Sequence, residues 1–222
     1  MAAIRPADFA DPAIHRHLRK ADPVLARVLR DHGPCRLTSE RRGSPYEALA
    51  SAVVHQQLHG KAAATIQKRV MDLAGGKRFP SPEEMADIDD ATLRAAGLSG
   101  NKLAALRDLA AKAADGTLPT ARSIVHLSDE EIIARCTAVR GVGRWTVEML
   151  LIFRLGRPDV MPVDDFGVRN GYRIAHDLDA MPAPKALLAA TQHWSPWRSV
   201  AAWYMWRVAD QEKLTRSALK ID

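Results

Sequence analysis

Cysteine is scarce in this 222-residue chain, which contains only Cys35 and Cys136. Zinc ribbons and ferredoxin-type iron–sulfur clusters use several closely spaced cysteines, so two distant ones exclude both kinds of site. A chain with so few cysteines fits a reducing compartment, and we therefore expect a cytoplasmic protein.

Long hydrophobic runs are absent as well. No stretch approaches the ~20 apolar residues that cross a bilayer, and the first residues, MAAIRPADFADP, lack the apolar core of an export signal. We expect no contact with a membrane. Alternating apolar and polar residues, which are typical of strands, are limited to short fragments such as residues 35–38. The chain is therefore predicted to be all-α.

The composition does provide a core and a surplus of positive charge. Hydrophobic residues make up 47% of the chain, which is enough for a packed core. The 32 Lys and Arg residues exceed the 26 Asp and Glu residues, and the net charge is +6. This charge suits a polyanionic partner, although many solvated surfaces are equally basic.

Apolar residues recur at helical spacing along most of the chain, and helix starts carry capping signals such as Ser44-Pro45 and Ser81-Pro82. We predict helices near residues 22–31, 45–58, 61–74, 82–87, 90–96, 100–115, 129–138, 145–155, 165–176, 184–191 and 196–210. No repeat or linker divides the chain, so residues 1–222 are predicted to form one domain. We expect two helical lobes, about residues 45–120 and residues 1–44 plus 121–222, with a cleft between them.

Two glycines lie between predicted helices in the stretch RGVGRWT, residues 140–146. Gly141 and Gly143 can take backbone angles closed to other residues, and a bare backbone there would present N–H groups to an anion. Three side chains would support a phosphate at this place: Arg140, Arg144 and Thr146. The alternative is an ordinary turn with a glycine cap, and the stretch alone does not decide between the two.

Two adjacent aspartates, Asp164 and Asp165, precede another predicted helix in PVDDFGVRNGYRI. Aspartate is a favoured helix N-cap, and capping alone would explain one of them but not both. A carboxylate at a helix N-terminus stays ionised, and an ionised group suits stabilisation of a sugar oxocarbenium ion. Arg169 is placed to pair with Asp165 or with a phosphate.

The segment HQQLH superficially resembles the zinc-binding HExxH pattern, because His55 and His59 are four residues apart. Gln56 stands where such a site needs a glutamate base, and Gly60 interrupts the helix. We therefore expect no zinc site.

Four segments together resemble the helix-hairpin-helix (HhH-GPD) DNA glycosylase superfamily, and within it the compact form of the 3-methyladenine DNA glycosylase II family. They are SPYEALASAVVHQQLHGKAAATI, GLSGNKLAALRDLA, RGVGRWTVEMLLIF with PVDDFGVRNG, and WSPWRSVAAWYMW. The resemblance covers about residues 40–206. It implies two helical lobes that flank a DNA-binding cleft, with a helix-hairpin-helix motif and a Gly/Pro loop before a catalytic aspartate.

The resemblance assigns the catalytic role to Asp165, which precedes Phe166-Gly167, and leaves Asp164 as a cap or second carboxylate. It implies that the hairpin holds a DNA phosphate through a set of residues around its turn: Gly141, Val142, Gly143, Arg144 and Thr146. A Na⁺ or K⁺ ion is expected on the carbonyl oxygens of three hairpin residues: Thr137, Val139 and Val142. No other cofactor is expected.

Members of the superfamily that also cut the strand carry a lysine directly after the hairpin, as a Schiff-base nucleophile. This chain has Trp145 there, which cannot attack a sugar carbon, so we expect no lyase activity. The resemblance implies a base pocket lined by Trp145, Trp206, Phe166 and Tyr46, in which an indole would face a base made cationic by alkylation. Core packing is the alternative for Trp145, and it is the role that we predict for Trp197 and Trp203.

The HQQLHGKAA stretch resembles the family's minor-groove wedge. Gln57, helped by Leu58, would fill the gap that a flipped nucleotide leaves. In the alternative, Leu58 packs in the core and Gln57 is merely exposed. Lys61 and Lys102 are further candidates for phosphate contacts.

These observations predict a monomeric, monofunctional DNA glycosylase that excises alkylated bases, such as 3-methyladenine and 7-methylguanine, from duplex DNA in base excision repair. One alternative is a glycosylase with specificity for ethenoadenine, hypoxanthine or uracil. Another is a helix-hairpin-helix protein that binds DNA without catalysis.

Overall fold

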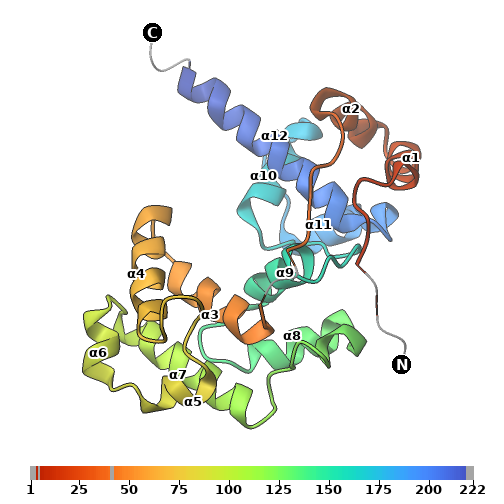
Figure 1. Ribbon diagram of the computed structural model, residues 1–222. Helices are drawn as coiled ribbons and strands as arrows, with labels where there is room; N and C mark the ends of the chain where they lie inside the picture. Colours follow the sequence, from red (N-terminus) through yellow and green to blue (C-terminus); the bar gives the residue numbers. More distant parts are fainter. Residues whose placement is uncertain (1–3, 5, 41–42, 219–222) are drawn as a thin grey trace. The chain divides into compact units, whose positions relative to one another are not determined.

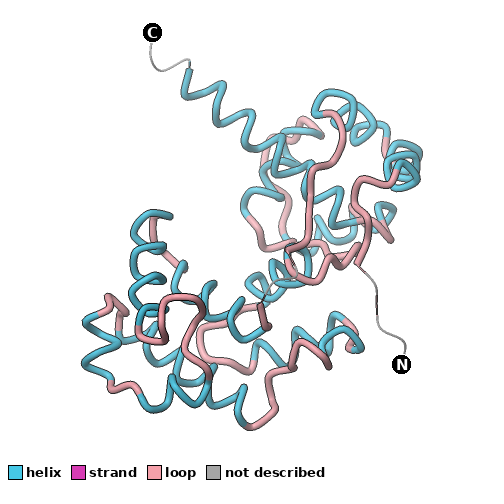
Figure 2. Tube along the Cα trace, in the orientation of Figure 1, coloured by secondary structure: helices cyan, strands magenta, loops and turns pink. Residues whose placement is uncertain are grey.

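The computed structural model describes residues 4, 6–40 and 43–218, and over these residues it contains helices and loops but no strand (Figures 1 and 2). The all-α prediction is therefore confirmed. None of the described helices combines the length and the apolar character that a membrane span requires.

The chain divides into two compact units. Unit 1 comprises Met1–Arg5 and Arg41–Leu150, and unit 2 comprises Pro6–Glu40 and Leu151–Asp222. The helices that begin in unit 1 are α3 (Pro45–His55), α4 (Gly60–Asp72), α5 (Pro82–Asp87), α6 (Asp90–Ala95), α7 (Gly100–Ala114), the 3₁₀ turn η1 (Ile124–His126), α8 (Asp129–Thr137) and α9 (Arg144–Phe153). Those of unit 2 are α1 (Pro12–Ala21), α2 (Pro23–His32), α10 (Phe166–Ala175), α11 (Pro184–Ala190), the 3₁₀ turn η2 (Gln192–Trp194) and α12 (Arg198–Ala218).

The predicted border of the middle lobe near residue 120 is wrong, because unit 1 continues to Leu150. Polar contacts attach α8 and the following hairpin to α7 and its C-terminal turn. The Arg135 Nε–H donates to the Thr117 carbonyl at 2.7 Å, and the Arg140 backbone N–H donates to the Asp108 carboxylate at 2.7 Å. These bonds join a side chain to a backbone group of a distant segment, and composition gives no sign of them.

Unit 1 builds its core from the facing sides of α3 and α7, with Leu49, Val53, Leu106 and Leu109 buried. Capping boxes start three of its helices, at Ser44 with Glu47, Ser81 with Glu84, and Ser128 with Glu131. In each box the serine accepts a backbone N–H of the helix while the glutamate accepts the N–H of the serine, so two otherwise unpaired donors are satisfied.

Unit 2 is centred on α10 and α12, which lie side by side (Figure 1). Their approach is so close that a Cβ atom on Gly171 would lie 1.9 Å from the Met205 carbonyl oxygen. Only glycine fits there. Trp194 and Tyr204 fill the surrounding core, whereas Trp197 and Trp203, which we predicted to be core, are both partly exposed.

Helix α1 was not predicted. It begins at the N-cap Asp11, whose side chain accepts the Ala13 N–H, and it buries only Ile14 and Leu18. Asp11 followed by Pro12 is a helix-start signal that sequence reasoning overlooked. Helix α12 also differs from its prediction, since it begins at Arg198 and continues to Ala218.

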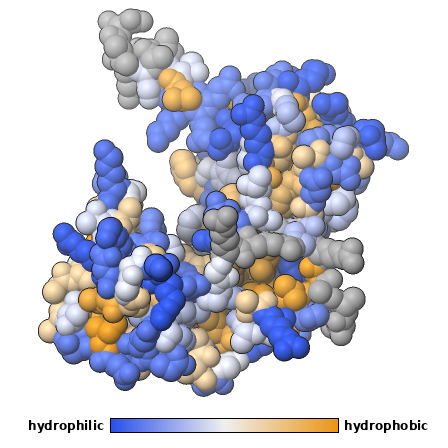
Figure 3. Space-filling view, viewed as in Figure 1, coloured by the Kyte–Doolittle hydropathy of each residue, from blue (hydrophilic) through white to orange (hydrophobic). Residues whose placement is uncertain are grey.

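The face shown in Figure 3 is covered largely by hydrophilic residues on both units, and apolar residues form separate patches. This distribution is typical of a solvated surface.

Candidate functional site

Asp165 is held at the start of α10 by donors from two helices. Its Oδ1 accepts the backbone N–H of Val168 at 2.8 Å, which makes Asp165 the N-cap of α10. The same Oδ1 accepts the indole Nε1–H of Trp206, from α12, at 2.8 Å. Hydrogen bonds to an ionised acceptor are stronger than those between neutral groups, so the carboxylate and the indole are fixed relative to each other.

Gly167 allows this approach. A Cβ atom on Gly167 would lie 2.9 Å from Trp206 Cδ1 and 3.1 Å from Asp165 Oδ1, both too short for an ordinary contact. The glycine two residues after Asp165 is therefore required for the bond between the carboxylate and the indole.

One aromatic ring packs on this pair, and another follows Asp165 in the chain. Phe153, the last residue of α9, stacks on Trp206 with ring centroids 5.6 Å apart and an interplanar angle of 28°. Phe166, directly after Asp165, is 67% exposed. Sequence reasoning missed Phe153, because in the apolar run MLLIF nothing distinguishes it from its buried neighbours.

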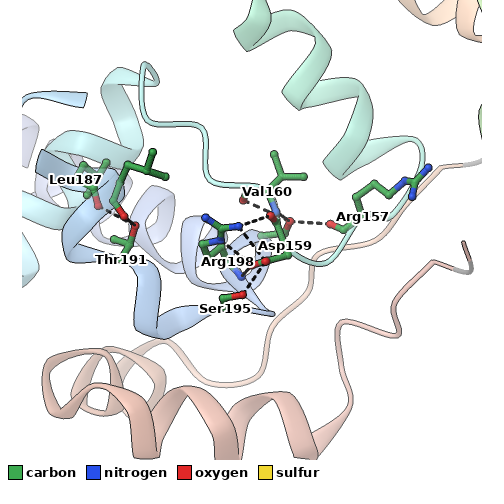
Figure 4. A network of polar contacts seen from close by, with 9 residues as sticks. Arg157, Asp159, Val160, Leu187, Thr191, Ser195 and Arg198 are labelled. Carbon is green, nitrogen blue, oxygen red and sulfur yellow. Dashed lines mark hydrogen bonds and ion pairs between the residues drawn. The ribbon is translucent and has the colours of Figure 1, made fainter. Parts of the chain in front are cut away.

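A polar network fixes the loop that leads from α9 toward Asp165 (Figure 4). The Arg198 guanidinium donates to both carboxylate oxygens of Asp159, at 2.7 and 2.9 Å, and the Ser195 hydroxyl donates to Oδ2 at 2.8 Å. Burial raises the pKa of Asp159, but the bonds from Arg198 and Ser195 outweigh it and hold the pKa below its ordinary value.

The neighbouring Ser199 hydroxyl donates to the Arg157 carbonyl at 2.7 Å and accepts the Val160 N–H at 3.0 Å. Figure 4 also shows Thr191, whose hydroxyl donates to the Leu187 carbonyl at 2.8 Å within the α11 region. The start of α12 is thereby tied to the loop that ends in Asp165, and the same helix carries Trp206.

The structure distinguishes the two aspartates. Asp164 is exposed, and its side chain makes no hydrogen bond with any part of the chain that the structure describes. Arg169, expected to pair with Asp165 or with a phosphate, instead donates its Nε–H to the Pro182 carbonyl at 2.9 Å. The geometry therefore singles out Asp165, while its catalytic role stays a prediction.

The hairpin of unit 1 forms the expected tight turn. Gly141 has a φ of +76°, a left-handed conformation that favours glycine, and the Val142 N–H donates to the Val139 carbonyl at 3.1 Å. A Cβ on Gly143 would meet no atom within 4 Å, so the backbone there is uncovered. An exposed backbone at the start of α9 is compatible with the predicted phosphate contact.

Two side chains that were predicted to support the phosphate contact do not face a ligand freely: Arg144 bonds to acidic groups, and Thr146 is buried. The Arg144 guanidinium donates to both carboxylate oxygens of Glu130, at 2.7 and 3.2 Å, and to Glu148 Oε1 at 3.0 Å, so two acidic groups offset its charge. The hydrogen bond that Arg144 donates to Glu130 is the main reason that the pKa of Arg144 is raised. Thr146 is buried at 7% exposure, which leaves its hydroxyl little access to a ligand. Arg140 is exposed.

The predicted wedge lies in the loop after α3. Gln57 is exposed and has a φ of +56°, and Leu58 is 39% exposed, so the alternative that placed Leu58 in the core is wrong. The preceding residue, Gln56, donates its side-chain amide to the Gly141 carbonyl at 2.9 Å. This bond ties the wedge loop to the hairpin, and sequence reasoning did not find it.

The histidines of the HQQLH segment do not form a metal site. His55 Nε2 lies 2.8 Å from Gln67 Oε1, and His59 is the N-cap residue of α4. No group of three metal-ligating side chains occurs within residues 4, 6–40 and 43–218. Lys61 is exposed, and Lys102 donates its Nζ–H to the Val54 carbonyl at 2.6 Å.

Two residues assigned to the base pocket lie in unit 1. Tyr46 is buried, and its hydroxyl donates to the Pro80 carbonyl at 3.1 Å, a packing role that gives its predicted place in a base pocket no support. Burial also raises the pKa of this phenol. Trp145 is 45% exposed, so the core alternative is wrong and its place in the pocket stays a prediction.

Comparisons with known proteins identify relatives. The family model described as "HhH-GPD superfamily base excision DNA repair protein" matches residues 50–196. The chain is 42% identical over 192 residues to "DNA-3-methyladenine glycosylase 1" of Schizosaccharomyces pombe, covering 86% of this chain and 83% of that protein.

Two solved structures are similar. One is the 3-methyladenine DNA glycosylase Mag1 of Schizosaccharomyces pombe in complex with abasic DNA, with a TM-score of 0.77, 41% identity, and coverage of 88% of this chain and 95% of that one. The other is a DNA-3-methyladenine glycosidase of Bacillus halodurans, with a TM-score of 0.81, 30% identity and coverage of 93% of each chain.

Proposed function

Because the chain belongs to the HhH-GPD superfamily of base excision DNA repair proteins, we propose that it is a monofunctional DNA glycosylase that excises alkylated bases such as 3-methyladenine and 7-methylguanine from duplex DNA. The observation that carries the proposal is the hydrogen bond between Asp165 and Trp206 at the start of α10.

The arrangement suits cleavage of an N-glycosidic bond in a nucleotide turned out of the duplex. An alkylated purine already carries positive charge and leaves easily, so the enzyme mainly has to hold the nucleotide and stabilise the sugar cation. The Asp165 carboxylate supplies a negative charge for that cation. The Trp206 indole, partly exposed and fixed by the same carboxylate, offers a π face to a cationic base.

Unit 1 supplies the contacts that hold the duplex in this proposal. The exposed Gln57 and Leu58 enter the minor groove, and the uncovered backbone at Gly143 meets a phosphate. Because Trp145 replaces the nucleophilic lysine of lyase members, the strand itself is left intact.

A monovalent cation at the hairpin is part of the proposal. The carbonyl oxygens of Thr137, Val139 and Val142 would hold it, and carbonyl oxygen is a suitable ligand for Na⁺ or K⁺. The Val139 carbonyl accepts only one hydrogen bond in the turn, from Val142, and a carbonyl has two lone pairs. We further propose a monomer that works in a reducing interior, which suits the free cysteines Cys35 and Cys136.

Replacing the carboxylate tests the catalytic role. In Asp165→Asn the amide oxygen can still accept the N–H groups of Val168 and Trp206, so the fold is retained while the charge is lost. We expect release of 3-methyladenine and 7-methylguanine from methylated duplex DNA to fall by on the order of 10²-fold or more, with DNA binding nearly unchanged. Base release is measured by chromatography of the free bases.

Asp164→Asn is the matched control, because Asp164 is adjacent and exposed. We expect it to retain most of the activity. Unchanged release by Asp165→Asn would remove Asp165 from its role. Salt-sensitive DNA binding by the wild-type protein without release of any base, from methylated DNA or from ethenoadenine, hypoxanthine and uracil substrates, would instead identify a non-catalytic DNA-binding protein.

A further inference from the structure

A surface cavity of about 400 Å³ in unit 1 lies where three segments meet. The wedge loop contributes Gln56 and Gln57, the first turns of α7 contribute Asn101 and Lys102, and the hairpin contributes Arg140. Nothing in the proposed catalytic role uses this cavity, because Asp165 and Trp206 belong to unit 2.

The side chains that line the cavity are suited to an anion. Lys102 and Arg140 carry positive charge, and no Asp or Glu lines the cavity beside them. The remaining polar lining is made of amide and hydroxyl groups. Those of Gln56, Ser99 and Asn101 can donate hydrogen bonds to phosphate oxygens, whereas Gln57 is assigned above to the minor groove.

The cavity is also fixed before any ligand arrives. The Gln56 amide is bound to the Gly141 carbonyl at 2.9 Å, and the Asp108 carboxylate holds the Arg140 backbone N–H at 2.7 Å. Lys102 Nζ is anchored on the Val54 carbonyl at 2.6 Å, which uses one of its three N–H donors. A preorganised site loses less freedom when its ligand binds.

The surroundings of Lys102 also favour a bound anion. Its ammonium is partly buried, and burial lowers the pKa of this lysine because the charged form is poorly solvated. A phosphate beside Nζ would restore the lost solvation of the charge. The anchoring carbonyl is neutral, so no acidic group competes for that ammonium.

We propose that this cavity holds a backbone phosphate of the bound DNA, which would give unit 1 a phosphate site in addition to the hairpin backbone. The proposal rests on the proposed function in so far as DNA is the ligand. It places Lys102 and Arg140, two candidates for phosphate contacts from the sequence, at one site and adds Gln56 and Asn101 to them.

The test measures how the affinity of the full-length protein for undamaged duplex DNA depends on salt, so it does not require base release. Dissociation constants of wild type, Lys102→Gln and Arg140→Gln are measured over a series of KCl concentrations. Each lost phosphate contact should reduce the slope of log Kd against log salt by about 0.9. Lys102→Arg should restore the wild-type slope, and Lys77→Gln, an exposed lysine of unit 1 outside the cavity, should leave it unchanged.

The outcomes separate this proposal from the glycosylase proposal. Reduced slopes with equal losses of affinity on duplexes of different sequence support a phosphate site, whether or not the protein releases a base. If both variants kept the wild-type slope, the proposal would be overturned. A loss of affinity that depended on the base pairs of the duplex would also overturn it, because it would show that the cavity reads a base. Arg140 is exposed, so Arg140→Gln keeps the test decisive even if Lys102→Gln fails to fold.

Discussion

Units 1 and 2 are both helical, but the polar contacts that stabilise their helices differ in kind. In unit 1 three helices start with capping boxes, in which each serine and its glutamate are three residues apart. In unit 2 the corresponding bonds join distant residues: Asp22 and Trp194 are 172 residues apart, Asp165 and Trp206 are 41, and Asp159 and Arg198 are 39. Unit 1 also has long-range bonds, such as the one from Gln56 to the Gly141 carbonyl across 85 residues, so what sets it apart is its capping boxes.

This difference predicts where a single substitution does most damage. Local caps act one helix at a time, and each contributes modestly. Buried long-range contacts in unit 2 hold two or more elements at once, so their loss should cost more.

The largest effect is expected at the crossing of α10 and α12. In Gly171→Ala the new methyl group would meet the Met205 carbonyl 1.9 Å away, and the backbone of one helix has to move. We expect the free energy of unfolding to fall by about 3 kcal/mol, measured by denaturant titration.

Gly60→Ala is the matched control in unit 1, since Gly60 is also helical and a Cβ there would meet nothing within 4 Å. Its stability should stay within about 0.5 kcal/mol of wild type or rise slightly. Equal losses in the two variants would show that the close crossing is not what makes unit 2 sensitive.

A smaller loss is expected from Trp194→Phe. The Trp194 Nε1–H donates to Asp22 Oδ2 at 2.9 Å, and Asp22 is only 4% exposed. Phenylalanine keeps an aromatic ring but removes a donor to a buried carboxylate, which should cost about 2 kcal/mol.

Ser44→Ala removes the cap of α3 in unit 1 and should cost about 1 kcal/mol. Denaturant titrations of Trp194→Phe and Ser44→Ala under one condition compare the loss of a long-range contact with the loss of a local one. If Ser44→Ala proved less stable than Trp194→Phe, the expected difference between the two units would be wrong.

The smallest effect on stability is expected from protonation of His176. Burial is the main cause that lowers the pKa of His176 below its ordinary value of 6.5. Well above pH 6.5 the imidazole is neutral in both the folded and the unfolded chain. As the pH falls below 6.5, the unfolded chain takes up a proton that the folded chain does not, so stability decreases until the folded pKa is reached.

His176→Phe retains an aromatic ring against Tyr172, whose ring centroid lies 4.0 Å from that of His176. Denaturant titrations between pH 5 and pH 8 should therefore show a weaker decline toward acid pH in this variant than in wild type. Parallel curves for the two proteins would contradict the assignment to His176.

The contrast between local caps and long-range contacts also explains which features could be predicted from the sequence. The helices with strong caps, such as those starting at Ser81 and Ser128, begin where their sequences indicate. Helix α1 was overlooked although Asp11 and Pro12 mark its start. At the candidate site, Asp165 and Trp206 were found through resemblance, and the bond between them was not.

Several side chains show why the rest of the site could not be predicted from the sequence. Arg144 has the same charge whether it meets a phosphate or Glu130, and only its partners distinguish the two roles. Tyr46 and Phe153 are both aromatic, yet one bonds to Pro80 in the core and the other stacks on Trp206. Residue type limits what a side chain can do, whereas its neighbours decide what it does.

By itself the sequence determined the helical class and the hairpin, because apolar period, capping residues and glycine act within a few positions of one another. Only the tertiary structure decided that Asp165, rather than Asp164, faces an indole, and that Gln56 joins the wedge loop to the hairpin. Both bonds depend on the packing of helices that lie far apart along the chain, and such packing depends on shape and burial, which no local pattern records.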